Sequence, residues 1–153
     1  MRVTIHTDGA CIGNPGPGGY GVVLQYGEYR KELSGGYRLT TNNRMEIMAA
    51  IVGLGALTRK SSVTLYTDSQ YLSNAMSKGW AKRWRANGWK RNSKETALNP
   101  DLWGRLLDLC EQHIVEFVWV RGHAGNLENE RCDELSTSAA RMKGLSPDSG
   151  YKG

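Results

Sequence analysis

Apolar and polar residues alternate at the start of the chain, which indicates a strand. Within residues 1–8, Val3 and Ile5 fall on one side and Asp8 falls on the other, as a period of two requires. Residues 9–19 follow and are rich in glycine and proline, so they should interrupt the strand. We therefore expect one strand that ends at Asp8, followed by a loop.

Two further strands are predicted after this loop. Residues 20–25 and 28–33 form two strand-like runs around a turn at Tyr26 and Gly27, and residues 35–38 extend the pattern. Strands joined by such a tight turn pair in antiparallel fashion. The first three strands should therefore form a meander.

Helical spacing replaces the alternation after residue 40. Residues 40–43 are of the types that cap helix N-termini, and apolar positions three and four apart then lead into the run 49–57, which reads as half of a buried helix. Asn99 and Pro100 have the chemistry of a second helix start, with asparagine as cap and proline in the first turn. Residues 128–143 are expected to close the domain as a helix.

Two short apolar runs complete the predicted sheet. Residues 63–67 lead to Asp68, and residues 114–120 are rich in β-branched and aromatic side chains, which indicates a buried strand. The segment between the runs has helical spacing broken by Gly79 and Gly88. Because right-handed crossovers make the later strands parallel to the first, we expect an α/β fold in which helices pack on a mixed sheet.

Size and composition are those of one globular domain. The chain has 153 residues, 39% of them hydrophobic and 23% charged, which suits a domain with a real core. We expect residues 1–153 to form a single domain whose polar tail, 147–153, frays. The longest apolar run, 49–57, is shorter than the roughly 20 residues that a membrane span needs. Since the N-terminus also lacks a signal-peptide pattern, a cytoplasmic protein is expected.

Cysteine usage argues against a disulfide-rich or zinc-binding protein. The chain contains Cys11, Cys110 and Cys132, an odd number without a CxxC pair. This pattern fits neither a disulfide framework nor a structural zinc site. Buried free thiols are the simplest interpretation.

The net charge of +5 conceals an uneven distribution. Residues 69–94 hold seven basic and no acidic side chains, so this segment carries +7 and the remainder −2. A basic run is often only a solvated helix face, but here Trp80, Trp84 and Trp89 are interleaved with the charges, and the first two lie four residues apart on one helical face. Because basic residues attract phosphates and indoles stack on bases or sugars, nucleic acid is the leading partner.

Four acidic residues occupy positions that the predicted fold would bring together. Asp8 and Asp68 each end a strand at the same edge of the sheet, Glu46 lies in the first turns of the helix between them, and Asp133 lies near the start of the last helix. Alone, Glu46 or Asp133 would more often serve a helix dipole or cap. Converging carboxylates repel one another unless cations bind between them, and their oxygens favour magnesium or manganese over zinc. Beside a cationic arm, this pattern favours two-metal cleavage of phosphodiesters.

Six short motifs follow one another along nearly the whole chain. They are Thr7–Cys11, Gly13–Gly21, Thr40–Glu46, Tyr66–Tyr71, Trp119–Gly125 and Asn129–Leu135. Together they resemble type 1 ribonuclease H of the bacterial kind. The resemblance implies the ribonuclease H-like fold, a five-stranded mixed sheet with three antiparallel strands followed by two parallel ones and helices on both faces. It also implies endonucleolytic hydrolysis of the RNA strand of RNA–DNA hybrids, such as replication primers and R-loops, giving 5′-phosphate and 3′-hydroxyl ends.

The resemblance further implies roles for individual residues at the catalytic centre. The ligands of two magnesium ions, for which manganese is a possible substitute, match Asp8, Glu46, Asp68 and Asp133. Asp8 matches the carboxylate that bridges the two ions. His123 matches a histidine in a mobile loop that assists proton transfer or product release.

Substrate-contacting residues are implied on two surfaces. The residues that match contacts on the minor-groove side and in a DNA phosphate pocket are Cys11, Asn14, Thr41, Asn42, Asn43 and Gln70. The residues that match contacts of the basic handle, about residues 76–95, are Trp80, Lys82, Arg83, Trp84 and Arg85. The implied partner is an RNA–DNA hybrid. The protein is expected to be a monomer that does not bind membranes. Whether a single-stranded DNA-binding protein is a further partner stays open.

Other functions fit the sequence less well. A catalytically silent nucleic-acid binder of the same fold should have lost an acid, yet all four are present. An integrase or junction resolvase would lack the motif at 40–46 and the tryptophan-rich handle. A dinucleotide-binding loop at 13–19 is disfavoured because its glycine spacing is not GxGxxG and no helix is predicted after it.

Overall fold

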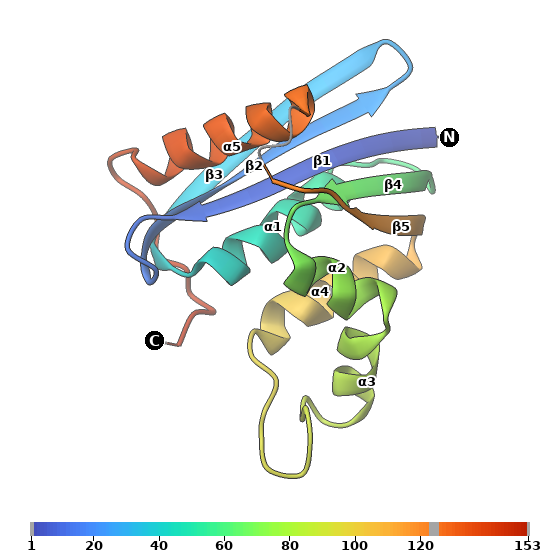
Figure 1. The fold of residues 1–153 in the computed structure, drawn as a ribbon, viewed down its shortest axis with the longest axis vertical. Coiled ribbons are helices and arrows are strands. Elements are labelled where there is room, and N and C mark those ends of the chain that lie inside the picture. The colour runs from blue at the N-terminus through green and yellow to red at the C-terminus, as the bar shows by residue number, and fades with distance from the viewer. Residues whose placement is uncertain (1, 123–125, 153) are drawn as a thin grey trace.

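The computed structural model describes residues 2–122 and 126–152, which form a five-stranded sheet with helices on both faces (Figure 1). The strands are β1 (Arg2–Cys11), β2 (Gly16–Tyr26), β3 (Tyr29–Thr40), β4 (Ser62–Thr67) and β5 (Ile114–Trp119). Their order across the sheet is β3-β2-β1-β4-β5. The β1–β2 and β2–β3 pairs are antiparallel, whereas β4 runs parallel to β1 and β5 parallel to β4. The predicted meander and the predicted parallel strands are both confirmed.

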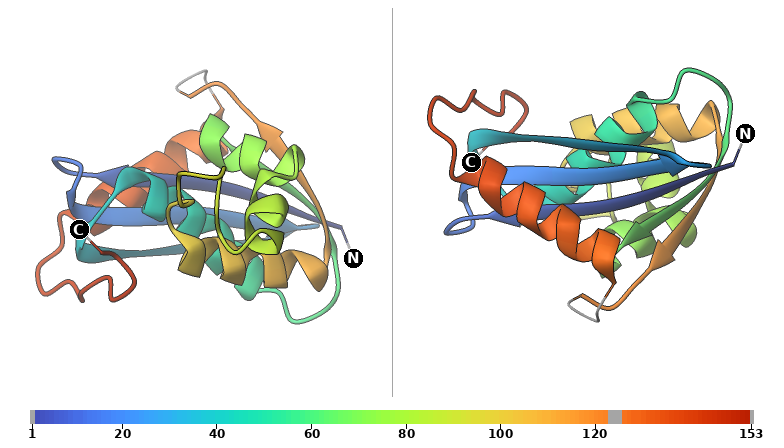
Figure 2. Two further views of the ribbon diagram at one scale, coloured as in Figure 1. Left: turned by 90° about the horizontal axis from the view of Figure 1, so that it is seen from below. Right: turned by 90° about the horizontal axis from the view of Figure 1, so that it is seen from above.

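Helices cover the two faces of the sheet unequally. The helices are α1 (Asn42–Gly55), α2 (Gln70–Ser77), α3 (Trp80–Ala86), α4 (Pro100–Glu111) and α5 (Leu127–Ala140). Of the described helices, only α5 lies across one face, while α1 and α4 lie on the other, with α2 and α3 beside them (Figures 1 and 2). None of the helices in the described part of the chain is long and apolar enough to cross a membrane.

The core lies mainly between α1 and the sheet. α1 is almost entirely buried, and its side chains Met45, Ile47 and Leu54 have no exposed surface. They belong to one apolar cluster with Ile5 of β1 and Leu65 of β4. A helix buried all round explains why the run 49–57 lacks a polar face.

The glycine-rich stretch 9–19 is less of an interruption than the sequence suggested. β1 continues past Asp8 to Cys11, and β2 already begins at Gly16, so the loop is only four residues long. Glycine serves here for packing: a Cβ on Gly21 would collide with the backbone oxygen of Cys132 in α5. Several glycines of β2 thus allow a helix to approach the sheet closely, a use that composition alone does not distinguish from a turn.

The predicted strand at 114–120 is present, but the prediction that it is buried was wrong. β5 occupies an edge of the sheet, and Ile114 and Trp119 are 64% and 43% exposed. β-branched and aromatic residues favour any strand, so their run does not reveal whether that strand is central.

The C-terminal tail packs against the domain instead of fraying at its start. Ser146 bridges to Tyr37 of β3, and the side chain of Asp148 is only 5% exposed. The tail therefore lies beside the start of α1, where Asp148 contacts Thr40 and Arg44.

Candidate active site

Three carboxylates converge where β1 and β4 separate. The parallel pairing of these strands ends at His6 and Tyr66, so the residues that follow diverge and leave room between them. Asp8 comes from β1, Asp68 from the residue after β4, and Glu46 from α1. One carboxylate oxygen from each lies within 4.8 Å of the others. The predicted meeting of these three acids is therefore found in the structure.

Close packing of α1 on β1 brings Glu46 to this point. A Cβ on Gly9 would lie 2.5 Å from the backbone nitrogen of Glu46, so only glycine allows the approach. The Gly9 amide also donates a hydrogen bond of 2.8 Å to the Asp8 Oδ1. In the first motif, Asp8 thus supplies a carboxylate, and Gly9 leaves the space that Glu46 needs to lie beside it.

Asp133 lines the same cavity from the opposite helix. The cavity has a volume of about 420 Å³, and its lining includes Asp8, Glu46, Asp68, Asp133, Cys11 and Asn42. Asp133 lies on α5 and does not belong to the group of three oxygens within 4.8 Å. The structure therefore places all four predicted acids around one cavity, with oxygens of Asp8, Glu46 and Asp68 within 4.8 Å of one another and Asp133 outside that group.

The electrostatics of the site favour a bound cation. Burial, and after it the negative charge of Asp68, raise the pKa of Asp8 to about 7. The pKa of Glu46 is also raised well above its usual range, mainly by burial and next by the negative charges of Asp8 and Asp68. Among the described residues, no hydrogen-bond donor reaches the buried Glu46 Oε2. An unpaired buried oxygen in a group of repelling carboxylates is what a divalent metal would satisfy.

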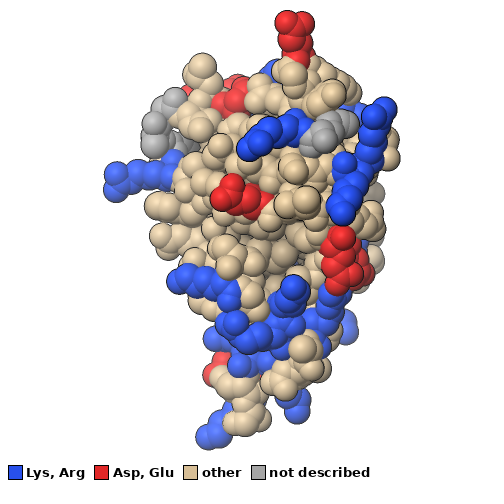
Figure 3. All heavy atoms as spheres, turned by 90° about the vertical axis from the view of Figure 1, so that its right-hand side faces the viewer, with Lys and Arg blue, Asp and Glu red and all other residues tan. Residues whose placement is uncertain are grey.

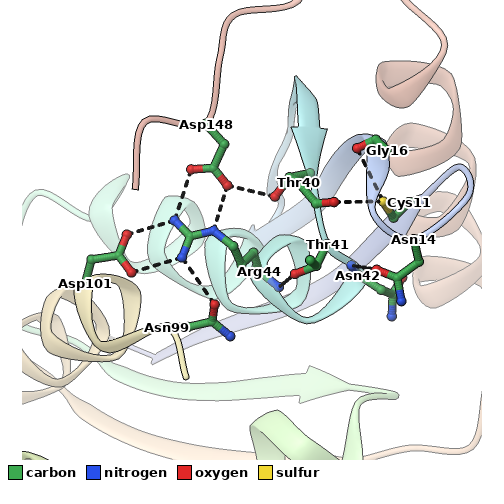
Figure 4. Close-up of polar contacts among 10 residues, drawn as sticks. All are labelled: Cys11, Asn14, Gly16, Thr40, Thr41, Asn42, Arg44, Asn99, Asp101 and Asp148. Carbon is green, nitrogen blue, oxygen red and sulfur yellow. Dashed lines mark hydrogen bonds and ion pairs between the residues drawn. The ribbon is translucent and has the colours of Figure 1, made fainter. Parts of the chain in front are cut away.

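Four of the predicted substrate-contacting residues, Cys11, Asn14, Thr41 and Asn42, lie around the start of α1 (Figure 4). Thr41 is the N-cap, and its hydroxyl oxygen accepts a 3.2 Å hydrogen bond from the Arg44 amide. The Asn42 amide donates to Asn14 Oδ1 at 3.0 Å, which ties the 12–15 loop to the helix. The Cys11 thiol donates to the carbonyl oxygens of Gly16 and Thr40. These contacts hold the loop and the helix start together as one surface.

Two more predicted contact residues continue this surface, and one prediction is outside the described structure. Asn43 is exposed in the first turn of α1, and Gln70 is exposed at the start of α2. His123 lies outside the described residues.

A second and larger cavity lies between α3 and the loop that follows it. Its volume is about 910 Å³, and its lining includes Asn43, Tyr71, Trp80, Arg83, Trp84, Asn87, Lys90 and Arg91. The rings of Trp80 and Trp84 lie 6.4 Å apart and tilted. Figure 3 shows Lys and Arg side chains gathered over this end of the molecule. The cavity thus combines indole rings with cationic walls.

The basic residues of the handle do not all face this cavity. Arg83 lines it, but Lys82 lines a different hollow, with Cys110 of α4 and Phe117 of β5. Arg85 pairs with two acids of α4, at 2.7 Å to Asp108 and 3.1 Å to Glu111. The structure therefore does not bring Lys82 and Arg85 together with the tryptophans.

Instead, the loop after α3 supplies positive charge that sequence reasoning assigned to no contact. Lys90 and Arg91 line the cavity on the side of this loop. Their charge was visible in the sequence, but the direction of each side chain depends on the loop. Trp89, with a positive φ of 64°, and the bridge between Lys90 and Thr96 shape that loop.

Arg44 is a buried cation that the sequence analysis did not single out. It is 2% exposed, and its guanidinium donates to Asp148, Asp101 and Asn99 (Figure 4). All five of its N–H groups thereby have an acceptor. Its position two residues before Glu46 in a helix of apolar residues was the available signal.

Comparison with known proteins agrees with this geometry. The family model described as RNase H matches residues 1–141. A protein named Ribonuclease H from Syntrophus aciditrophicus is 73% identical over 150 residues, which cover 98% of this chain and 87% of that protein. A protein named Ribonuclease HI from Synechocystis is 61% identical over 150 residues, covering 97% of this chain and 94% of its own.

Solved structures agree as well. The crystal structure of LC9-RNase H1, described as a type 1 RNase H with the type 2 active-site motif, superposes with a TM-score of 0.80 at 34% identity, covering 91% of this chain and 72% of that one. RNase H1 from the halophilic archaeon Halobacterium salinarum superposes with a TM-score of 0.69 at 27% identity, covering 91% and 97%. Since sequence and fold agree over nearly the whole length, this chain belongs to the ribonuclease H family, in its bacterial type 1 form.

Proposed function

We propose that this ribonuclease H hydrolyses the RNA strand of RNA–DNA hybrids in the cavity lined by its four acids, leaving a 5′-phosphate and a 3′-hydroxyl. The observation that carries the proposal is the meeting of Asp8, Glu46 and Asp68 oxygens within 4.8 Å, in a cavity that Asp133 also lines. Relatives that share most of this sequence are named Ribonuclease H, which supports the same chemistry.

The four acids fit a pair of divalent metal ions. Their ligand atoms are all carboxylate oxygens, which suit magnesium and also manganese, and Glu46 Oε2 is buried and awaits a partner. We assign Asp8, Glu46, Asp68 and Asp133 as the metal-holding residues. When bound, two such ions activate a water and stabilise the leaving oxygen of the phosphodiester.

The chain itself supplies rigid presentation of these groups. Asp8 is fixed by the β1–β2 pairing at Gly21 and by the hydrogen bond from the Gly9 amide. Glu46 is held inside a fully packed helix. Asp8, Glu46 and Asp68 share their cavity with Asp133, so all four would hold the ions, and a role of Asp8 toward both ions is what the family resemblance implies.

The surface beside this cavity suits a two-stranded substrate. The start of α1 presents Thr41, Asn42 and Asn43 next to the carboxylates, and the cationic tryptophan cavity shares Asn43 with it. We assign the RNA strand to the carboxylates and the DNA strand to the tryptophan cavity. The O–H of Thr41 remains able to donate to a DNA phosphate, since only its oxygen is used as a cap.

A cleavage assay with matched substrates tests this proposal. The protein is incubated with an RNA–DNA hybrid, a DNA duplex and an RNA duplex of one sequence, with magnesium omitted and then restored. We expect cleavage of the hybrid RNA alone and only with the metal. Equal cleavage of all three substrates, or full activity in a chelator, would contradict it.

We also propose that the protein works as a cytoplasmic monomer. Light scattering after size-exclusion chromatography, with and without hybrid, would test the oligomeric state. A dimer in the absence of hybrid would contradict it.

A further inference from the structure

Asp68 lies in the short connection between β4 and α2, and a residue of β5 is hydrogen-bonded to its backbone. β4 ends at Thr67 and α2 begins at Gln70, so Asp68 belongs to neither element. The indole Nε1 of Trp119, the last residue of β5, donates a hydrogen bond of 3.0 Å to the Asp68 carbonyl oxygen. The backbone of Asp68 is thereby tied to the neighbouring strand by a side chain.

Two backbone features continue this contact beyond Trp119. The Val120 amide donates to the Thr67 carbonyl oxygen at 2.8 Å, which extends the β4–β5 pairing by one step. A Cβ on Gly122 would lie 3.0 Å from the Asp68 Oδ2, so the chain after β5 passes directly beside the carboxylate. The segment from Trp119 to Gly122 thus lies beside both the backbone carbonyl and the carboxylate of Asp68.

Burial of apolar surface does not account for Trp119. It is 43% exposed on an edge strand, where a large indole is not needed for the core. Its N–H, in contrast, reaches an acceptor on a residue of the carboxylate cluster. The polar end of the side chain therefore carries the specific interaction.

Asp68 needs such support because its carboxylate sits among like charges. After burial, the negative charge of Asp68 is among the causes that raise the pKa of both Asp8 and Glu46, as expected for repelling carboxylates. Repelling groups separate unless the backbone that carries them is restrained. A ligand set held in place in advance binds its ion without paying for reorganisation.

We propose that Trp119 is a positioning residue for Asp68: its indole N–H holds the carbonyl of Asp68 so that the carboxylate is oriented for metal binding before the ion arrives. This inference rests on the proposed function, in which Asp68 holds a metal. In this role Trp119 acts through the backbone of Asp68 and is not itself a ligand of the metal.

A pair of substitutions separates the hydrogen bond from the ring. Trp119→Phe removes the donor and keeps an aromatic ring. Trp119→His places its Nε2 at the ring position equivalent to the indole Nε1, so at pH 8 it restores an N–H donor on a smaller ring. Ile114→Ala, an exposed apolar position at the other end of β5, controls for a general disturbance of the strand.

Magnesium affinity is the readout that a purely structural role would not move. It is measured by titrating magnesium into the metal-free protein and following backbone amide shifts by NMR. We expect Trp119→Phe to weaken magnesium binding about two- to tenfold, as the loss of one hydrogen bond predicts, and Trp119→His to recover most of it. Single-turnover rates at subsaturating magnesium should follow the same order. Hybrid affinity in a chelator should stay unchanged, and the melting temperature of Trp119→Phe should fall by no more than about 2–4 °C, as the loss of one hydrogen bond implies.

Unchanged magnesium affinity in Trp119→Phe would overturn the inference, as would an equal loss in both Trp119 variants or in Ile114→Ala. Asp68→Asn separates this failure from a failure of the proposed function. If Asp68→Asn loses magnesium binding while Trp119→Phe keeps it, only the positioning role is wrong. If Asp68→Asn keeps both magnesium binding and turnover, the metal assignment itself is wrong.

Discussion

Arg44 binds both carboxylate oxygens of Asp148, a residue 104 positions later in the chain, with its Nε 2.7 Å from Oδ2 and its Nη2 3.0 Å from Oδ1. Both side chains are buried, at 2% and 5% exposure. Thr40 donates a further hydrogen bond of 2.7 Å to Oδ2. The pair therefore joins the C-terminal tail to the first turn of the helix that carries Glu46.

Removing Asp148 should destabilise the protein strongly. Asp148→Ala leaves Arg44 buried with part of its hydrogen bonding lost, and breaking a buried pair in this way costs about 3 kcal/mol or more. Asp101, which is 40% exposed, still pairs with Arg44 and keeps the loss toward the lower end. Urea unfolding measures the change. The control Glu134→Ala, at an exposed pair with Arg131, should cost at most about 1 kcal/mol; an equal loss in both variants would contradict the prediction.

Acid should weaken the same contact. Burial raises the pKa of Asp148, but the hydrogen bonds from Arg44 and Thr40 outweigh it, and the net pKa is lowered. The contribution is therefore present above the pKa of an unfolded aspartate, about 4, and disappears as the pH falls through the lower folded value. Unfolding free energies measured from pH 6 to pH 2 should fall more steeply for the wild type than for Asp148→Asn. Parallel curves would rule out the contribution.

The metal-free carboxylate cluster should show the opposite pH dependence. The pKa of Asp8 is raised to about 7, so the folded state favours its protonated form. Its contribution is present below the pKa of an unfolded aspartate and is lost as the pH rises to about 7. In a chelator, Asp8→Asn should therefore raise the melting temperature at pH 8 and change it little at pH 4. Magnesium should stabilise the wild type more than this variant at pH 8, and equal stabilisation would count against the metal assignment.

Neutralising a metal-holding acid should stop turnover without preventing substrate binding. Asp8→Asn and Asp68→Asn keep the side-chain shape but remove the charge, so the single-turnover rate should fall by several orders of magnitude. Hybrid affinity measured in a chelator should stay within a few-fold of the wild type. Near-normal turnover of either variant would show that the acid holds no essential ion.

Two lysines of the handle should differ in their effect on binding. Lys90 lines the tryptophan cavity, whereas Lys82 faces the hollow beside Cys110. Lys90→Glu should weaken hybrid binding and reduce the slope of affinity against salt concentration by about one. Lys82→Glu makes the same charge change and should leave that slope nearly unaltered. A larger effect at Lys82 would place the substrate on the other side of α3.

Much of the carboxylate site was predictable because it depends on local patterns and on strand direction. Alternation identified β1, the apolar run before Asp68 identified β4, and helical spacing identified α1 with Glu46 in its first turns. Since right-handed crossovers make β1 and β4 parallel, their acids had to emerge at one edge. No knowledge of side-chain packing was needed for this step.

The handle and the tail were not predictable in the same way. Sequence indicated a basic, tryptophan-rich segment, but not that Arg85 turns to Asp108 or that Lys90 faces the cavity. A charge count contains no direction, because the direction of each side chain is set by the loop and helix that carry it. Likewise, an exposed edge strand and a buried central strand share the residue preferences seen in β5.

By itself, the sequence determined the order of strands and helices, the family and the acids to which we assign the chemistry, because hydrophobic periodicity, turn residues and short motifs act over a few neighbouring positions. Only the tertiary structure decided that Asp148 reaches Arg44 and that Trp119 reaches Asp68. Such contacts join residues 104 and 51 positions apart. They exist only after the sheet and helices have packed, since a single side chain has no periodicity that could announce its partner.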